Sequence, residues 1–510
     1  MRPVALLVRI APALAIGLLL VPVAGGLLGV ALPAFGWLPA LGGEQFGLTA
    51  WERLLTTPGL GRMVAISYAS GVATALVALL VVVLYLAAFT GTRLYAAVRR
   101  AVSPILAVPH AAAAFGLAFL IAPSGLLARL FSPWVTGWER PPDLLIVNDA
   151  WGLTMMAGLV VKEIPFLLLM ALAALPQCHA PERLAVARTL GYRPVAAWLK
   201  TVLPARYPLI RLPVYAVIAY ASSVVDVALI LGPSTPPPLS VAVVRWLNDP
   251  ELDLRFVASA GALLQLAVTL AALASWYLGE RLVVALARGW LASGRRGVCD
   301  RLLGALGLAG AGTAVGLAAA GLLGLAVWSV AGFWRFPEAL PQDFTLRTWL
   351  RAGDGIPEPL ANAALIGTVA TLTALVLVLA ALEHEVRSGR PVGRQAQAVL
   401  YLPLLVPQVA FLFGLVLVQA RMGVRPGLWP VILGHLVFVF PYVYLSLVEA
   451  YRRLDPRWAQ LALSLGASPD RAFLAVRLPL LLAPCLTAAA VGFAVSIGQY
   501  LPTQLLGAGR

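Results

Sequence analysis

Apolar stretches of about twenty residues recur along the whole chain, and short polar or charged segments separate them. A helix of that length matches the hydrocarbon thickness of a bilayer. Of the 510 residues, 61% are hydrophobic and only 12% are charged, which leaves far more apolar surface than a soluble globule can bury. The sequence therefore predicts an all-α polytopic membrane protein in contact with membrane lipid.

We predict eleven transmembrane helices, beginning with a retained first span rather than a cleaved leader. With the N-terminus in the cytoplasm, most of the 37 Lys and Arg residues fall in cytoplasmic segments, as the positive-inside rule requires. This placement accounts for the net charge of +15 without nucleic acid as a partner. The expected spans are residues 10–31, 64–88, 105–122, 152–174, 212–231, 257–278, 304–331, 360–382, 398–418, 428–448 and 481–505.

Two cytoplasmic segments share one pattern. Pro181 to Gly191 and Pro456 to Gly466 lie 275 positions apart, and each is followed at equal intervals by an aromatic residue and a Leu-Pro pair. These residues are Trp198 with Leu203-Pro204, and Phe473 with Leu478-Pro479. Each copy is predicted to be a short helix that a left-handed glycine ends, followed by a second short helix.

The two predicted hairpins differ where they start. Asp455 can cap the helix that Pro456 opens, whereas no comparable acid precedes Pro181. Within the hairpins we expect a narrow apolar surface among arginines, suited to a groove in another protein. Its residues are Leu184, Ala187 and Gly191 in the first copy and Leu461 and Leu465 in the second. Two ordinary amphipathic connectors are the alternative, which the matched spacing disfavours.

The repeat divides the chain into two parallel modules. A second pair of matching segments, Pro104 to Leu117 and Pro403 to Leu415, supports this division. The basic, glycine-containing stretch from Arg288 to Gly297 is predicted to be a cytoplasmic linker. We therefore predict a module of six spans over 1–295 and one of five spans over 296–510, in which the sixth span is expected to be missing.

The hairpins resemble the EAA loop of binding-protein-dependent ABC importer permeases, the MetI-like family. The third and fourth predicted spans, with Trp151-Gly152 and Lys162 to Phe166, make the chain similar to fused two-module permeases of the YnjC type, which are assigned to thiamine or iron(III) systems. Ala187, Ala462 and both glycines keep the motif. Its glutamate is replaced by Ala185 and Gln460, and its first alanine by Val186 and Leu461.

The resemblance implies the permease subunit of an importer in the bacterial inner membrane, with two ATP-binding subunits docked at the hairpins and a periplasmic binding protein that delivers a small solute. It implies thiamine or a related compound as solute, with iron(III) or a small anion as the alternative, and no cofactor. The residues expected to couple to the ATPase are Ala187, Leu190, Gly191, Trp198, Pro204, Ala462, Leu465, Gly466, Phe473 and Pro479.

The motifs of an ATPase or another enzyme are absent from the sequence. A phosphate-binding loop needs Gly-Lys-Ser/Thr, whereas Lys162 and Lys200 follow Val161 and Leu199. We therefore predict that the chain is not an enzyme and that ATP is hydrolysed by a partner. Neither the histidines nor the cysteines show the spacing of a metal site or a disulfide framework. They are His110, His179, His384 and His435, and Cys178, Cys299 and Cys485.

Charged residues within the predicted spans mark a candidate translocation path. Lys162, Glu163 and Asp226 are costly in lipid unless water or a partner receives them. Lys162 and Glu163 point about 100° apart on a helix, so they cannot simply face each other. Structural pairing with other spans is the alternative for these three residues. For His110 a hydrogen-bonded packing role is favoured over a place on the path.

A secondary transporter is the remaining alternative, since its proline-broken helices have a similar sequence. Its common signature is a pair of inverted repeats, whereas the two modules predicted here are parallel.

Overall fold

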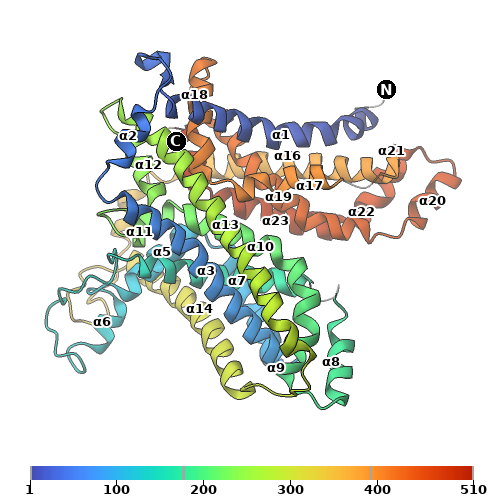
Figure 1. The fold of residues 1–510 in the computed structure, drawn as a ribbon, viewed down its shortest axis with the longest axis horizontal. Helices are drawn as coiled ribbons and strands as arrows, with labels where there is room; N and C mark the ends of the chain where they lie inside the picture. Colours follow the sequence, from blue (N-terminus) through green and yellow to red (C-terminus); the bar gives the residue numbers. More distant parts are fainter. Residues whose placement is uncertain (1–2, 175–177, 391–392, 508–510) are drawn as a thin grey trace. The chain divides into compact units, whose positions relative to one another are not determined.

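The computed structural model describes residues 3–174, 178–390 and 393–507, and these are almost entirely helical (Figure 1). Within these ranges the regular strands are β1 (Trp37–Leu38) and β2 (Gly43–Glu44), which form one short antiparallel pair. The predicted all-α class is confirmed. In the described ranges nine helices are long and apolar enough to cross a membrane, or up to eleven when two bent pairs each count as one span.

The chain packs into two compact units. Unit 1 comprises residues 1–47 and 355–510, and unit 2 comprises residues 48–354. This division does not follow the predicted modules, because the first helix packs with helices of the second module and the helix over 300–329 packs with those of the first. The modules were inferred from repeated sequence, and as repeats they stay a prediction.

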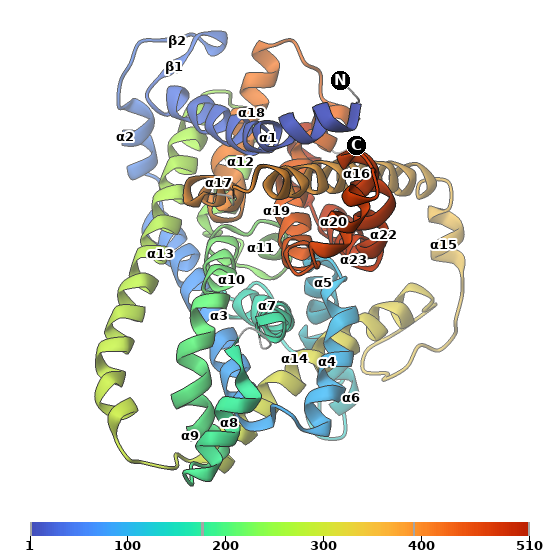
Figure 2. The ribbon, with the colours of Figure 1, turned by 90° about the vertical axis from the view of Figure 1, so that its right-hand side faces the viewer.

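Unit 2 is built around α3 and α7. Its helices are α2 (Thr49–Leu55), α3 (Leu60–Phe89), α4 (Arg93–Leu106), α5 (His110–Ile121), α6 (Leu126–Phe131), α7 (Leu153–Ala174), α8 (Ala180–Thr189), α9 (Pro194–Ala197), η3 (Trp198–Val202), α10 (Leu203–Ser223), α11 (Asp226–Leu231), α12 (Leu239–Leu247), α13 (Leu254–Ala292), α14 (Asp300–Ser329) and α15 (Arg347–Ala352). Figure 2 shows α7 nearly end-on, and α3, α4, α5, α10, α11 and α14 all contact it.

Unit 1 is built around α16, α19 and α23, which pack against one another. Its helices are α1 (Pro3–Ala34), η1 (Pro39–Leu41), α16 (Pro357–Ser388), α17 (Arg394–Leu405), α18 (Gln408–Arg421), α19 (Leu428–Arg452), α20 (Arg457–Ser464), α21 (Pro469–Ala472), η4 (Phe473–Arg477), α22 (Leu478–Leu480), α23 (Leu482–Ile497) and α24 (Tyr500–Gly507). The long first helix lies against α18 and α16.

Glycines allow close helix contacts in both units. A Cβ atom added to Gly26 or Gly29 of α1 would lie within 2.5 Å of a carbonyl oxygen of α18. In unit 2 the backbones of Gly116 and Gly321 bring α5 and α14 together in the same way, since an added Cβ on either would approach the other backbone to about 3 Å. Without side chains at these positions, the helices gain van der Waals contact over a long stretch.

Several predicted spans have different limits in the structure. The span predicted at 398–418 is divided into α17 and α18, which are bent by 94°, and the span predicted at 481–505 is divided into α23 and α24. The span predicted at 105–122 starts at His110, because the chain leaves helical geometry between α4 and α5 and resumes after Pro109. The span predicted at 212–231 ends at Ser223, where Val224 becomes extended, and α11 starts anew at Asp226. The last two predicted turns of that span therefore form a separate short helix.

Candidate functional site

Both predicted hairpins are present, and a glycine ends the first helix of each. Gly191 has φ +80° and Gly466 has φ +85°. In the first copy the N–H of Tyr192 donates to the carbonyl oxygen of Ala187 at 3.1 Å, and in the second the N–H of Ala467 donates to that of Ala462 at 3.0 Å. These bonds close the same left-handed C-cap in both hairpins, as the sequence pattern predicted.

The predicted aromatic residues start a π-helical turn in each copy. Trp198 opens η3 and Phe473 opens η4, and both side chains are buried. Pro204 and Pro479 follow directly within a continuous run of helical backbone, where each removes one backbone donor just after the π-helical turn. A π-helical turn widens the helix locally and occurs frequently at functional sites. The sequence spacing predicted the position of this turn but not its π-helical geometry.

The exposed apolar face agrees with the predicted one in the second hairpin, where Leu461 and Leu465 are exposed, and differs from it in the first. Leu184 and Ala187 are buried in the core of unit 2, so they cannot form a surface for another protein. Among the large exposed apolar side chains, two pairs occupy matched positions of α8 and α20. They are Val186 (61% exposed) with Leu461 (54%), and Leu190 (57%) with Leu465 (80%). We call these four residues the hairpin face.

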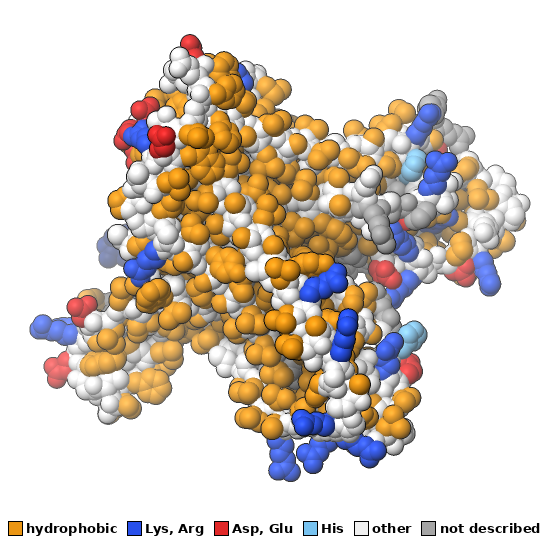
Figure 3. All heavy atoms as spheres, in the orientation of Figure 1, with side chains coloured by type: hydrophobic (Ala, Val, Ile, Leu, Met, Phe, Trp, Pro, Cys, Tyr) orange, Lys and Arg blue, Asp and Glu red, His pale blue; other side chains and the backbone are white. Residues whose placement is uncertain are grey.

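The two hairpins start differently, as expected. Asp455 accepts a hydrogen bond from the N–H of Arg457 at 2.9 Å and so caps the second hairpin. His179 precedes the first hairpin in a left-handed conformation, and its side chain makes no capping bond. Basic side chains gather around α8 and α9 in unit 2 and around α20 and α21 in unit 1 (Figure 3), as the positive-inside rule expects of a cytoplasmic segment.

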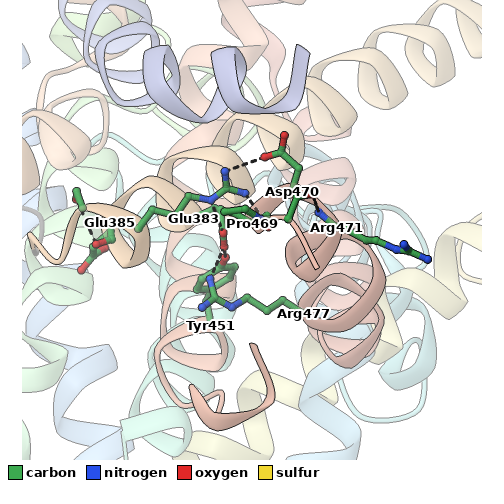
Figure 4. A network of polar contacts seen from close by, with 10 residues as sticks. Glu383, Glu385, Tyr451, Pro469, Asp470, Arg471 and Arg477 are labelled. Atoms are coloured by element: carbon green, nitrogen blue, oxygen red, sulfur yellow. Dashed lines mark hydrogen bonds and ion pairs between the residues drawn. The ribbon is translucent and has the colours of Figure 1, made fainter. Parts of the chain in front are cut away.

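A buried ionic network holds the second hairpin. Glu383, near the end of α16, has a side chain that is 2% exposed. Its Oε1 lies 2.7 Å from Nε of Arg387, and its Oε2 lies 2.7 Å from Nη1 of Arg477 in η4. Tyr451 of α19 also donates to this carboxylate, and Figure 4 shows Glu383, Tyr451 and Arg477 turned toward one another. Sequence reasoning missed this network, although an acid at the end of an apolar run was a signal.

Three of the four predicted path residues lie close together in unit 2. Nε2 of His110 lies 3.1 Å from Oε1 of Glu163, which connects the start of α5 with α7. The His110 ring lies 4.8 Å from the ring of Tyr220, whose hydroxyl donates to Asp226 at 3.4 Å. Lys162 points elsewhere and donates to the carbonyl oxygen of Ile105 at 2.6 Å. We call His110, Glu163, Tyr220 and Asp226 the polar cluster.

A neutral set of polar residues lies at the corresponding breaks of unit 1. Gln408, which starts α18 as His110 starts α5, donates from Nε2 to Oε1 of Gln499 at 3.2 Å. His435 is buried and bonds to Ser496 at 2.8 Å and to Thr503 at 2.9 Å. Nothing in the sequence connects these residues, because they come from four separate helices and the break between α23 and α24.

The helices, hairpins and buried polar groups define a multi-pass membrane permease. The profile of the family described as binding-protein-dependent transport system inner membrane component matches residues 374–510. The chain is 31% identical to the inner membrane ABC transporter permease protein YnjC of Escherichia coli (strain K12) over 463 residues, which cover 91% of this chain and 82% of that protein.

Shorter relatives match about a third of the chain. One from Salmonella typhimurium, described as a 2-aminoethylphosphonate transport system permease protein, PhnV, is 29% identical over 33% of this chain and 64% of its own length. The spermidine/putrescine transport system permease protein PotC of Haemophilus influenzae is 25% identical over 27% of this chain and 52% of its own length. No solved structure matches the chain.

The chain therefore belongs to the binding-protein-dependent ABC permease family, and it is the inner-membrane permease subunit of an importer. Membership implies ATP-binding and substrate-binding partners.

Proposed function

We propose that the two hairpins dock two separate ATP-binding subunits, and that the permease moves a small solute that a periplasmic binding protein delivers. The observation that carries the docking step is the hairpin face. The same two positions of each hairpin, Val186 with Leu190 and Leu461 with Leu465, expose large apolar side chains. Exposed apolar groups in matched positions on a capped, rigid helix suit a groove in a partner.

Co-purification tests the docking step. The chain is expressed with the ATP-binding and binding proteins encoded beside it, and the ATP-binding subunits retained per permease are counted. Leu190→Asp and Leu465→Asp are each expected to remove one subunit, since a charge on the hairpin face must be desolvated on docking. The control is Leu346→Asp, because Leu346 is exposed in the loop before α15. Leu153 is also exposed, but it lies in a span and is not a suitable control.

Loss of both subunits in either single variant would contradict independent docking at two hairpins. Retention of both subunits in the double variant would contradict docking at the hairpin face altogether. Transport by the chain alone, driven by an ion gradient and indifferent to ATP, would favour a secondary transporter instead.

For the solute we propose thiamine or a related compound, with iron(III) or a small anion as the alternative. The polar cluster supports a solute with positive charge, because Glu163 and Asp226 place two carboxyl groups beside one histidine. The shorter relatives are named for 2-aminoethylphosphonate and for spermidine/putrescine, all of which carry amino groups. These names support an amine-containing solute without choosing among such compounds.

The solute is tested with the binding protein encoded beside the chain. Its affinity for thiamine, putrescine, 2-aminoethylphosphonate and iron(III) is measured by calorimetry, and uptake of the best ligand is followed in vesicles that contain the whole complex. Binding and ATP-dependent uptake of thiamine would support the first candidate. Preference for iron(III) or for an anion would replace it.

We also propose that Lys162, Glu163, Asp226 and His110 lie along the translocation path. The contacts of His110 with Glu163, and of Asp226 with Tyr220, support a shared environment for three of them. The Lys162 ammonium donates to the carbonyl oxygen of Ile105 at the C-terminal end of α4, where the helix dipole favours a positive charge.

A further inference from the structure

One carboxylate ties both ends of the second helix of the second hairpin to the transmembrane helices. Arg387, which Glu383 holds, reaches the beginning of that helix: its Nη1 lies 2.8 Å from Oδ1 of Asp470, and its Nη2 donates to the carbonyl oxygen of Pro469 at 3.3 Å. Arg477, which the other oxygen of Glu383 binds, lies at the end of η4. The whole segment between Pro469 and Arg477 is therefore fixed from one point.

The first hairpin is held differently. Gly71 of α3 lies against Ile218 and Ser222, and Gly367 of α16 lies against Phe493 and Ile497, which are the repeat counterparts of those residues. This correspondence places Ala87 of α3 where α16 has Glu383.

The other members of the network also have apolar counterparts in the first half. The 275-residue repeat places Val195 where the second half has Asp470, and Val202 where it has Arg477. Ala87, Val195 and Val202 are all buried in the hydrophobic core of unit 2. The side chains at these three places are thus apolar in the first hairpin and charged in the second, although the backbone N–H of Val195 also donates to Oδ1 of Asp300 at 3.0 Å.

The two kinds of contact respond differently to a change in one member. Apolar packing is non-directional, so the loss of one side chain leaves the other contacts in place. A buried carboxylate between two guanidinium groups is directional, and its removal leaves Arg477 without this counter-charge and Arg387 with Asp470 alone. Arg387 and Arg477 would then repel, and both ends of the segment from Pro469 to Arg477 would be held less firmly.

We propose that Glu383 is a positioning residue for the second coupling hairpin: it holds α21 and η4 against α16 and α19, so that movement of the hairpin moves these helices. The role in coupling rests on the proposed docking of an ATP-binding subunit at this hairpin. The role in positioning does not, because the contacts lie within this chain.

Positioning is tested without any partner. A spin label is attached at Leu465→Cys or, in a second variant, at Leu190→Cys, both exposed positions on the hairpin face. The background carries Cys299→Ser, since Cys299 is the exposed one of the three cysteines and Cys178 and Cys485 are buried. The permease is placed in lipid nanodiscs, and the mobile fraction is read from the room-temperature spectrum.

Glu383→Gln is expected to raise the mobile fraction at position 465 at least about threefold and to leave position 190 unchanged, since release is confined to the local segment. Glu449→Gln is the matched control. Glu449 lies on α19 and makes an exposed ion pair with Arg453, just after the end of that helix, so its substitution should change the mobility of neither label. Equal mobility of the Glu383→Gln and parent proteins at position 465 would overturn the proposal. So would equal rises at both positions, which indicate general unfolding.

A triple variant separates loss of the ion pairs from simple repulsion between the arginines. Glu383→Ala combined with Asp470→Val and Arg477→Val gives the residues of the first half, Ala87, Val195 and Val202. We expect the mobile fraction at position 465 to stay as high as in Glu383→Gln, because no ion pair of Glu383 or Asp470 then ties the segment to α16. A mobile fraction at the parent value would show that apolar contacts, and not these ion pairs, fix the hairpin.

The coupling role is read separately, in the complex with its ATP-binding subunits. Glu383→Gln is expected to keep subunits bound while solute moved per ATP hydrolysed falls at least about fivefold, because the hairpin face itself is intact. An unchanged ratio together with a mobile label would overturn the coupling role and leave positioning in place. Failure of the parent permease to bind ATP-binding subunits would instead contradict the proposed function.

Discussion

The N–H of Tyr192 and the carbonyl oxygen of Ala187 meet at 3.1 Å across Gly191, and this bond requires the glycine to be left-handed. The same bond across Gly466 ends the second hairpin's first helix. The direction of the second short helix of each hairpin, α9 or α21, and of the helix after it therefore depends on these two glycines.

Substitution of either glycine by valine should therefore weaken docking more than folding. A β-branched residue resists the left-handed region by ~1–2 kcal/mol, which is enough to turn the second short helix away. Gly191→Val should lower retention of one ATP-binding subunit about tenfold, as should Gly466→Val. Gly294→Val is the control, since its backbone is not left-handed and no atom lies near its Cβ position. Normal retention in both hairpin variants would mean that the hairpins are only connectors.

Alanine at these glycines should distinguish the two copies. A Cβ atom at Gly191 would lie 3.3 Å from Nη1 of Arg296, whereas no atom lies within 4 Å at Gly466. Gly191→Ala should thus perturb the contact with Arg296 in addition to straining the backbone, and Gly466→Ala should only strain it. The measurement is proteolysis of the hairpins in the purified permease. Faster cleavage of the second hairpin than of the first would contradict this order.

The polar cluster should matter for transport and not for assembly. Glu163→Gln and Asp226→Asn keep the shape of the side chains, so we expect normal membrane yield and subunit retention. Transport should slow at least about tenfold, equivalent to ~1.4 kcal/mol in the barrier. Glu139→Gln, an exposed residue of the loop before α7, is the control. If both variants transport at the parent rate, the path lies elsewhere.

The crossing of α1 and α18 should tolerate no side chain. A Cβ at Gly414 would lie 1.8 Å from the carbonyl oxygen of Gly26, so Gly414→Val must separate the helices. We expect a loss of ~1–3 kcal/mol in stability, seen as a lower melting temperature in detergent. Gly25→Val, beside Gly26 but with no atom within 4 Å, should change it by less than ~0.5 kcal/mol. Equal melting temperatures for the two variants would contradict the close crossing.

The native thiols offer a test of orientation. Cys299 is exposed in the linker between α13 and α14, and Cys178 and Cys485 are buried. A membrane-impermeant maleimide should label the native chain in inverted vesicles and not in intact spheroplasts. Trp134→Cys with Cys299→Ser, which moves the only exposed thiol to the loop after α6, should reverse this result. Labelling of native Cys299 from outside would invert the predicted topology.

The sequence predicted the helical class and the glycine caps of both hairpins, because these depend on local apolar length and on residues close in the chain. The eleven predicted spans lie at the upper end of the nine to eleven candidates among the described residues. The prediction misassigned the exposed face of the first hairpin. The spacing of Leu184 and Ala187 fits a docking surface and a buried helix face equally well. Which of the two a helix face becomes depends on elements that are distant in the sequence. The Glu383 network was missed for the same reason, since Tyr451 and Arg477 approach Glu383 only after folding.

The break at Val224 was missed because no proline or glycine marks it in the sequence. Ser222, Ser223 and Asp226 flank the break, and their residue types are favoured at helix ends, but none of them forbids a helix.

The first helix packs with α18, which the ribosome produces hundreds of residues later. During synthesis α1 must therefore enter the membrane and remain there with Gly26 and Gly29 facing lipid. The glycines leave that face without bulky side chains, so lipid chains alone cover the helix until its partner arrives. A delay in synthesis after the first half, or separate expression of residues 1–295, would leave α1 in the membrane without α18 and accessible to membrane proteases.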